Sequence, residues 1–317
     1  MLKILVYILR RLLSAVPTIA IVSVFVFLLQ KLLPGDPVTA MLGEDRDPAI
    51  IAALRLHYHL DDPLITQYFS WAFDVARGDL GFSLRSHQQV TELIAEKLPV
   101  TFELALLAIL FALCIGVPAG IMAAVKKGTG WDHAAGAVAL WGLSIPNFWF
   151  GILLILFVSV QLKWLPSSGH ANFLDDPAQN LKTMIMPAFV LGNALAASLM
   201  RHTRSAMLNV LKSDYIRTAR AKGLLEPRVI LKHAFRNALV PIVTLSALLF
   251  GELMAGAVLT EQIFSIPGFG KLIVDAVFNR DYAVVQGVVL CTAVGFIVMN
   301  LLADVAYFFL NPRLRTA

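Results

Sequence analysis

The chain has 317 residues, of which 58% are apolar and only 15% are charged, and its mean hydropathy is +0.75. Soluble proteins carry roughly one quarter charged residues, so the composition excludes a soluble globular protein and indicates a membrane protein with several spans. The net charge of +5 and the pI near 9.3 do not call for a nucleic-acid partner, because membrane proteins gather Lys and Arg in their cytoplasmic loops. Cys114 and Cys291 both lie in apolar runs, and neither a disulfide framework nor a zinc site is predicted.

Six apolar segments are long enough to cross a bilayer, which takes about 20 helical residues. They are residues 12–33, 100–125, 135–160, 184–204, 239–262 and 284–309. The first follows Lys3, Arg10 and Arg11, but it is long for a signal peptide and no small-residue cleavage site follows it. It is therefore predicted to remain as a transmembrane helix. The predicted fold class is an all-α polytopic membrane protein with six transmembrane helices.

The segment between the first two spans is too long to be a simple connector. Asp47-Pro48 and Asp62-Pro63 each match the start of a helix, and the second helix is expected to run toward Gly78. We therefore expect a helical subdomain at 34–99, on the outer face, after an N-terminal segment and first helix at 1–33. The predicted organisation continues with a membrane core at 100–310, which includes a cytoplasmic region at 212–238. It ends with a cytoplasmic tail at 311–317.

The distribution of basic residues predicts the orientation of the spans. With the N-terminus inside, the inner segments 1–11, 125–134, 201–238 and 310–317 hold 16 Lys and Arg residues in 67 positions, whereas the short outer loops 161–183 and 263–283 hold 4 in 44. Because basic residues stay on the cytoplasmic side, both termini are predicted to be cytoplasmic.

The inner segment 201–238 is the most basic part of the chain, with nine Lys and Arg residues. Tyr215 to Lys222 is predicted to form a helix that Gly223 ends. Glu226-Pro227 is predicted to start a second helix that runs into the fifth span. Two short helices around a glycine make a compact cytoplasmic knob, which either only fixes the topology beside anionic lipid or docks a cytoplasmic partner.

The helix after Glu226-Pro227 is expected to be two-sided. Its predicted apolar face consists of Leu231, Ala234, Phe235 and Ala238. Arg228, Lys232 and Arg236 repeat at four-residue spacing and form a separate basic stripe. The ordered helix signals and the small residues Ala219 and Ala221 favour docking, because small side chains can enter a tight groove.

The knob resembles the coupling motif of permease subunits of ATP-binding-cassette (ABC) importers. Two stretches are similar to the form of this motif found in the dipeptide and oligopeptide branch. They are Tyr-Ile-Arg-Thr-Ala-Arg-Ala-Lys-Gly at 215–223 and His-Ala-Phe-Arg-Asn-Ala-Leu-Val-Pro at 233–241. The general Glu-Ala-Ala signature of the superfamily is matched only at its second alanine, Ala219. Further similar stretches are Leu33-Pro-Gly-Asp-Pro37, Gly78-Asp-Leu-Gly-Phe-Ser83, Ser144-Ile-Pro-Asn-Phe148, Trp164-Leu-Pro-Ser-Ser-Gly169, Phe264-Ser-Ile-Pro-Gly-Phe-Gly270 and Arg280-Asp-Tyr282.

This resemblance implies a type I ABC importer permease fold and an ATP-driven importer of dipeptides or short oligopeptides in the bacterial inner membrane. The long first outer loop is typical of the first permease of the pair. The implied partners are a second permease, two ATPase subunits that bind ATP and Mg, a periplasmic solute-binding protein and membrane lipid. The implied ATPase-coupling residues are Tyr215, Arg217, Thr218, Ala219, Arg220, Ala221, Lys222, Gly223, Glu226 and Pro227, with Gly223 forming the elbow and Arg217, Arg220 and Lys222 contacting the ATPase.

Polar residues inside the spans are candidates for a pathway. Asn193 and Glu252 lie within apolar runs, where polar groups are costly and often functional. We expect them on the translocation pathway, at the interface between permeases, or in a structural hydrogen bond between helices.

Other functions receive less support from the residues. A self-sufficient secondary transporter or channel should show intramembrane charge pairs and inverted repeats, and charges in the spans are sparse. An intramembrane enzyme is disfavoured because no Ser/His/Asp or zinc-protease pattern occurs, and no P-loop motif for ATP is present. His57 and His59 point apart on a helix, so no metal site is predicted. A related ABC permease for nickel or another small solute stays open as an alternative substrate class.

Overall fold

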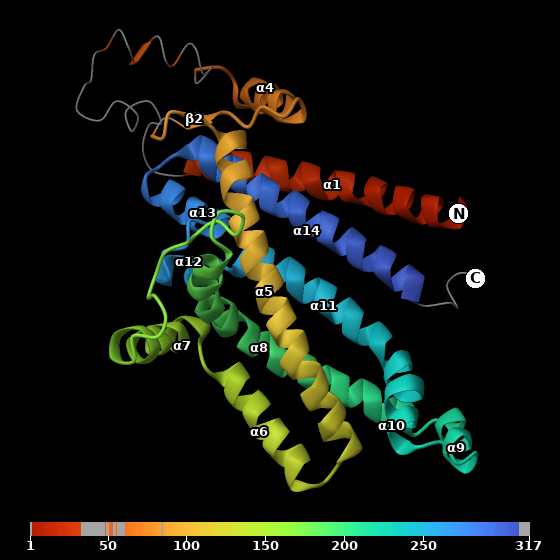
Figure 1. The fold of residues 1–317 in the computed structure, drawn as a ribbon. Helices are drawn as coiled ribbons and strands as arrows, with labels where there is room; N and C mark the ends of the chain where they lie inside the picture. Colours follow the sequence, from red (N-terminus) through yellow and green to blue (C-terminus); the bar gives the residue numbers. More distant parts are fainter. Residues whose placement is uncertain are drawn as a thin grey trace.

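The computed structural model describes residues 2–32, 48, 51–52, 55, 61–83 and 85–310, and these residues are almost entirely helical (Figure 1). The helices are α1 (Leu2–Leu32), α4 (Leu64–Ala76), α5 (Val90–Val125), α6 (Gly130–Ser144), α7 (Asn147–Leu154), the π-helical η1 (Ile155–Gln161), α8 (Pro177–Leu211), α9 (Asp214–Ala221), α10 (Glu226–Arg228), the π-helical η2 (Val229–Phe235), α11 (Arg236–Gly256), α12 (Val258–Ile263), α13 (Phe269–Phe278) and α14 (Tyr282–Leu310). A two-residue antiparallel ladder joins β1 (Phe82–Ser83) to β2 (Gln88–Gln89).

Within the described residues, five helices are long and apolar enough to cross a membrane, and the bent pair of α6 with α7 and η1 makes a sixth span if it counts as one. The first, second and fourth to sixth predicted spans are thus confirmed as elements, although α5 starts at Val90 and α8 covers Pro177–Leu211, both longer than predicted. The predicted boundary between residues 99 and 100 consequently falls inside α5. The predicted helix at Asp47-Pro48 and the tail at 311–317 lie outside the described residues, apart from a few isolated positions.

The third span predicted over residues 135–160 is broken in two, because the chain bends by 96° between α6 and the continuous pair of α7 and η1. Ile145 is extended, with φ −86° and ψ 124°, and Pro146 precedes the first residue of α7. A residue before proline is pushed out of the helical region, and proline has no N–H to donate. Pro146 therefore separates the end of one helix from the start of the next.

The centre of the bundle is the contact between α5 and α8, which cross closely in Figure 1. Gly116 and Gly120 of α5 are buried. A Cβ built on Gly116 would lie 2.5 Å from the Ala196 carbonyl oxygen of α8, and one built on Gly120 would lie 2.6 Å from the Met200 carbonyl oxygen. In the same way, a Cβ built on Gly192 of α8 would lie 2.8 Å from the Ala108 carbonyl oxygen of α5. Small residues at these positions let the two backbones approach each other, and the surrounding apolar residues form the largest buried cluster.

The chain between α11 and α14 is fastened to α5 by a buried carboxylate. Glu261 of α12 is fully buried, accepts a hydrogen bond from the Thr101 hydroxyl of α5 and accepts another from the backbone N–H of Lys271 at 2.7 Å. The Phe269 N–H donates to the Thr101 oxygen at 2.8 Å. The carboxylate and the Thr101 hydroxyl thus each accept from one free N–H group in the first turn of α13.

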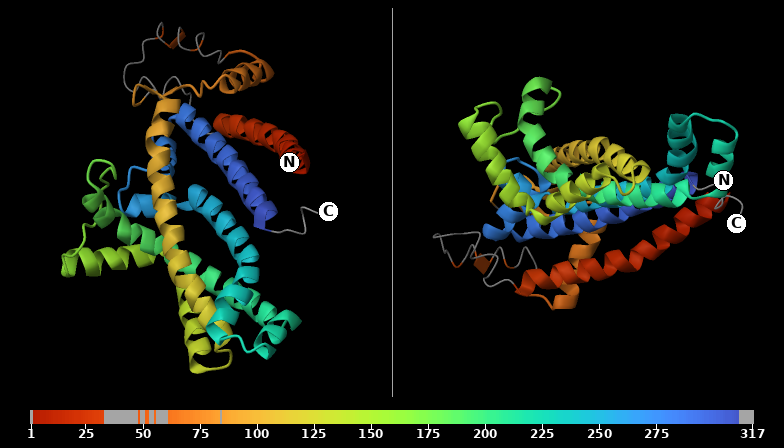
Figure 2. Two further views of the ribbon diagram at one scale, coloured as in Figure 1. Left: turned by 45° about the vertical axis from the view of Figure 1, so that its right-hand side comes forward. Right: turned by 90° about the horizontal axis from the view of Figure 1, so that it is seen from below.

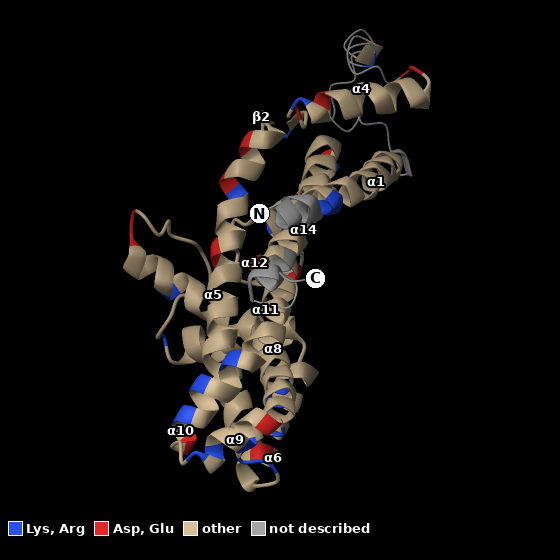
Figure 3. Ribbon diagram, turned by 90° about the vertical axis from the view of Figure 1, so that its right-hand side faces the viewer, with Lys and Arg blue, Asp and Glu red and all other residues tan. Residues whose placement is uncertain are grey.

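The two ends of the molecule differ in their content of basic residues. Figure 3 shows Lys and Arg gathered around α9 and α10, at the end opposite α4. Helix α1 lies at the edge of the bundle beside α14, as both views in Figure 2 show. The start of α1 and the end of α14 lie on the same side of the bundle (Figure 1).

Candidate functional site

The candidate site is a knob formed by residues 214–228, which comprise α9, a turn and α10 (Figure 1). The helix α9 predicted at 215–222 is confirmed, as is the restart at Glu226-Pro227. Ile216 is fully buried and Ala219 is nearly so, and both belong to the same apolar cluster as Met207 of α8 and Val229 of η2. The knob is therefore a continuous extension of the packed bundle.

The turn after α9 is a Schellman motif, which fixes the angle between α9 and α10. The Gly223 N–H donates to the Arg220 carbonyl at 2.9 Å, and the Leu224 N–H donates to the Ala219 carbonyl at 3.4 Å. Gly223 has φ +76°, the left-handed conformation that glycine adopts without a steric penalty and that this motif requires. A Cβ on Gly223 would meet no atom within 4 Å, so the need for glycine lies in the backbone alone.

An ion pair closes the elbow across this turn. The Arg220 guanidinium donates from Nε to Glu226 Oε2 at 3.1 Å and from Nη2 to Oε1 at 2.6 Å. This two-point contact raises the pKa of Arg220 further above its ordinary value, so the side chain keeps its charge. Because Arg220 and Glu226 flank Gly223, their contact joins the end of α9 to the start of α10.

The other predicted coupling residues take different places. Arg217 pairs with Asp214 at 2.7 Å, but the two side chains are 83% and 88% exposed, so this pair opens easily. Thr218 donates to the Asp214 carbonyl at 3.0 Å. Ala219 packs inside the chain's own core and is not available to a partner, whereas Ala221, Lys222 and Pro227 are exposed.

The exposed surface of the knob also carries apolar side chains that sequence reasoning did not assign to it. Leu225 is 76% exposed and Tyr215 is 44% exposed. Leu231 was predicted to share one face of the second helix with Ala234 and Ala238, but it is 60% exposed whereas those two are buried, so that part of the prediction is wrong. The reason is the π-helical turn of η2, in which residues five apart share a face: Val229 and Ala234 are both fully buried, and Leu231 between them points outward.

A second interaction near this end was missed from the sequence. Arg204 of α8 donates from Nε and Nη2 to both carboxylate oxygens of Asp132, at 2.6 and 2.8 Å. Asp132 also accepts from the Gly128 N–H at 2.9 Å. Because Asp132 is 8% exposed, this contact holds the start of α6 against α8. The only signal was that Asp132 is one of three acidic residues in the inner segments.

The two pathway candidates are not brought together by any contact recorded among the described residues. Asn193 is half-buried, and its amide group lies against Gly142 of α6, 3.3 Å from where a Cβ of that glycine would be. Glu252 of α11 is exposed in the single chain. Asn193 thus occupies a contact between helices, whereas Glu252 lies on a surface open to a neighbour.

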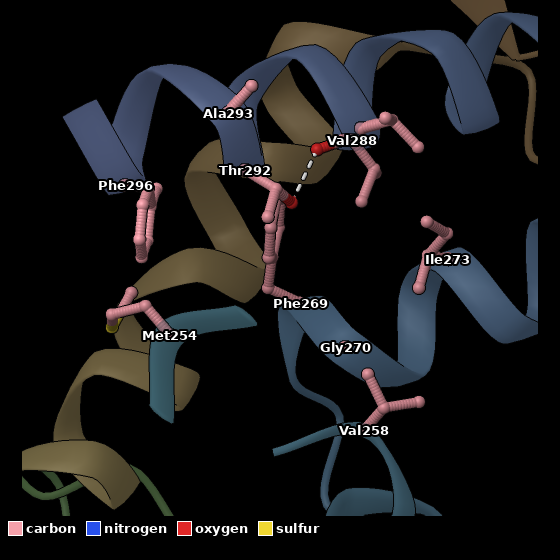
Figure 4. Close-up of a pocket in the computed structure, with 10 residues that line it drawn as sticks. Met254, Val258, Phe269, Gly270, Ile273, Val288, Thr292, Ala293 and Phe296 are labelled. Atoms are coloured by element: carbon pink, nitrogen blue, oxygen red, sulfur yellow. Dashed lines mark hydrogen bonds between the residues drawn. The ribbon is translucent and has the colours of Figure 1, made fainter. Parts of the chain in front are cut away.

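An apolar cavity of about 400 Å³ lies between α11, α12, α13 and α14 (Figure 4). Phe269, Ile273, Val288 and Phe296 are among the side chains that line it, and the Thr292 hydroxyl donates to the Val288 carbonyl instead of facing a ligand. Neither Asn193 nor Glu252 lines this cavity.

Comparison with solved structures gives the fold. The fold matches the inward-facing MetNI methionine ABC transporter with a TM-score of 0.56 at 18% identity, over 69% of this chain and 96% of that chain. The chain therefore has the all-α fold of type I ABC importer permeases.

Comparison of sequences then gives the family. Residues 116–316 match the family of binding-protein-dependent transport system inner membrane components, and residues 1–105 match its N-terminal companion. The chain belongs to this family. It is 44% identical to the dipeptide transport system permease protein DppB of Escherichia coli (strain K12), over 98% of both chains. It is 43% identical to a di/tripeptide transport system permease protein of Pseudomonas aeruginosa, again over 98% of both, and 42% identical to a putative peptide transport system permease protein of Brucella abortus, over 97% of this chain and 98% of the relative.

Proposed function

We propose that this chain is the first of two permease subunits in an ATP-driven importer that moves dipeptides or short oligopeptides across the bacterial inner membrane by alternating access. The family and the fold define an ABC importer permease. The peptide substrate is supported by relatives that are similar over almost their whole length and carry dipeptide, di/tripeptide or peptide transport in their names.

The knob at residues 214–228 is proposed to face the cytoplasm, with both termini on the same side. The basic residues around α9 and α10 in Figure 3 support this orientation, because Lys and Arg are retained on the cytoplasmic side of a membrane. Helix α4 then lies on the periplasmic side, where a solute-binding protein delivers the substrate.

The observation that carries the coupling role is the rigid Schellman elbow, which projects exposed side chains from a buried base. Arg217 and Lys222 would offer positive charge to an acidic cleft, and Leu225 and Tyr215 would fill its apolar part. Arg220 has another task, because its contact with Glu226 keeps α9 and α10 at one angle. Movement of the cleft would then displace the knob, and the packing of Ile216 and Ala219 in the main core would pass the displacement to α8 and η2.

The partners follow from this arrangement. Two ATPase subunits carry ATP and Mg, and this chain supplies no catalytic residue. A second permease completes the pathway, to which Asn193 and Glu252 would contribute directly or through the interface between permeases. Membrane lipid surrounds the bundle.

We expect that Gly223→Val uncouples the importer. A β-branched residue in the left-handed region costs roughly 1–3 kcal/mol, which corresponds to a shift of about 5- to 150-fold in the population of the native elbow. The rate of peptide uptake into reconstituted vesicles should fall by a factor within that range. ATP hydrolysis by the assembled complex should no longer respond to substrate. The measurement compares uptake and ATPase rates of the four-subunit complex with its binding protein.

Gly223→Asn is the matched control, because Asn tolerates the left-handed conformation better than Val does and a Cβ at this position meets no atom within 4 Å. Uptake should be largely retained in Gly223→Asn. Normal coupled uptake by an assembled Gly223→Val complex would contradict the assignment of the elbow.

A further inference from the structure

Helix α4 presents three different surfaces along its length. One surface packs against α1 through Tyr68 and Trp71. The second is exposed and apolar and consists of Ile65, Phe69 and Phe73, which follow one another at four-residue spacing and are 73%, 66% and 56% exposed. The third is exposed and polar and consists of Thr66, Ser70 and Asp74, each one residue further along. Residues four apart share a helix face, so the apolar and polar surfaces lie side by side.

Contacts with α1 fix the depth of α4. The Tyr68 hydroxyl and the Ser23 hydroxyl share a hydrogen bond of 2.8 Å, and the Phe27 ring lies 5.5 Å from the Tyr68 ring and 5.8 Å from the Trp71 ring, between centroids. In the sequence, the apolar run of this span ends at Leu29, and Gln30 and Lys31 follow it. Helix α4 therefore lies level with the last turn of a membrane span, and Figure 3 shows it running across the direction of α5.

The surroundings at this depth favour lipid as the neighbour of the apolar surface. Helix α1 lies at the edge of the bundle (Figure 2), and Phe25 and Leu28 in its last turns are 61% and 46% exposed. The apolar surface of α4 is therefore next to a peripheral span, at the boundary where aromatic residues are enriched. Arg77, just after α4, has its guanidinium 3.9 Å from the centre of the Phe73 ring, and long basic side chains at such positions reach lipid phosphates.

We propose that α4 is an interfacial helix bound to phospholipid. Ile65, Phe69 and Phe73 face the acyl chains, Thr66, Ser70 and Asp74 face water, and Arg77 faces the headgroups. The leaflet is the outer one in the orientation given under the proposed function, but the lipid contact itself does not depend on that function. Helix α4 would thus anchor the outer end of α1 at a fixed depth.

The test compares two neighbouring positions in the full chain, assembled with its partner subunits in nanodiscs. Cys114 and Cys291 are first replaced by alanine, and Phe69→Cys or Ser70→Cys then carries an environment-sensitive fluorophore. Because the apolar face of an interfacial helix enters the headgroup and acyl boundary, we expect nitroxide lipids labelled near the headgroup to quench the label at position 69 roughly twofold more than the label at position 70. Aqueous iodide should show the reverse order. Phe73→Cys repeats the test on the same surface if Phe69→Cys does not yield folded protein.

Each other outcome overturns the proposal. Equal access of iodide to both labels would place the apolar surface in water. Protection of the position 69 label from both iodide and nitroxide lipids would mean that a protein, such as the second permease or the binding protein, covers it. Either result leaves the coupling role of the knob untouched, because that role is measured by uptake and ATP hydrolysis.

Discussion

Gly120→Val is expected to disrupt the contact between α5 and α8 and to lower the free energy of unfolding by about 3 kcal/mol or more. The added Cβ would lie 2.6 Å from both the Met200 carbonyl oxygen and the Thr203 Cβ. A backbone oxygen cannot move aside as a flexible side chain can, so the two helices must separate along their length. The loss is measured as the change in thermal stability and in the monodisperse fraction of the chain purified alone in detergent.

Gly295→Val is the matched control for this experiment. Gly295 also lies within a spanning helix, α14, but a Cβ built on it meets no atom within 4 Å. Its replacement should change stability by less than about 1 kcal/mol. Equal stability of both variants would show that α5 and α8 do not make the close contact on which the bundle is built.

The second large effect concerns the charges of the knob. Arg220→Glu is expected to abolish most peptide uptake, because two carboxylates would then face each other across the elbow. The double variant Arg220→Glu with Glu226→Arg exchanges the two charges and re-forms the ion pair. It should restore most of the uptake. An exposed pair contributes only about 0.2–1 kcal/mol to stability, so both variants should assemble normally, and uptake by the assembled complex is the measurement.

The neighbouring pair of Arg217 and Asp214 supplies the contrast. Both side chains are almost fully exposed, and we propose that Arg217 contacts the ATPase. Exchange of these two charges should therefore leave uptake impaired even though their ion pair is re-formed. Rescue at the Arg217 pair, or failure of rescue at the Arg220 pair, would contradict the division of roles between holding the elbow and contacting the partner.

Much of the fold was predictable because it depends on local patterns. Long apolar runs define spans wherever the chain stays helical, and a glycine followed by Glu226-Pro227 defines the end of one helix and the start of the next. The confirmed position of α9 rests on these signals alone. The spacing of Gly116 and Gly120 suits close helix packing, but it does not indicate that α8 is the partner helix.

The features that were missed depend on tertiary contacts or on local departures from regular geometry. Pro146 can kink a helix or break it, and only packing decides which. The π-helical turn that exposes Leu231 has no distinct sequence signature, since one extra residue per turn is accommodated by the neighbouring elements. Arg204 and Asp132 are 72 residues apart in the chain, and nothing in either segment indicates that the other is its partner.

Site-directed cross-linking tests the central claim most directly, namely that the knob is the contact through which separate ATPase subunits drive this permease. Arg217→Cys, in a chain whose two native cysteines are replaced by alanine, should cross-link to an ATPase subunit in native membranes. Leu174→Cys, which is 86% exposed in the loop between η1 and α8, should not. Absence of any cross-link between Arg217→Cys and an ATPase, or modification of that cysteine by an impermeant reagent from the periplasmic side, would contradict the coupling role.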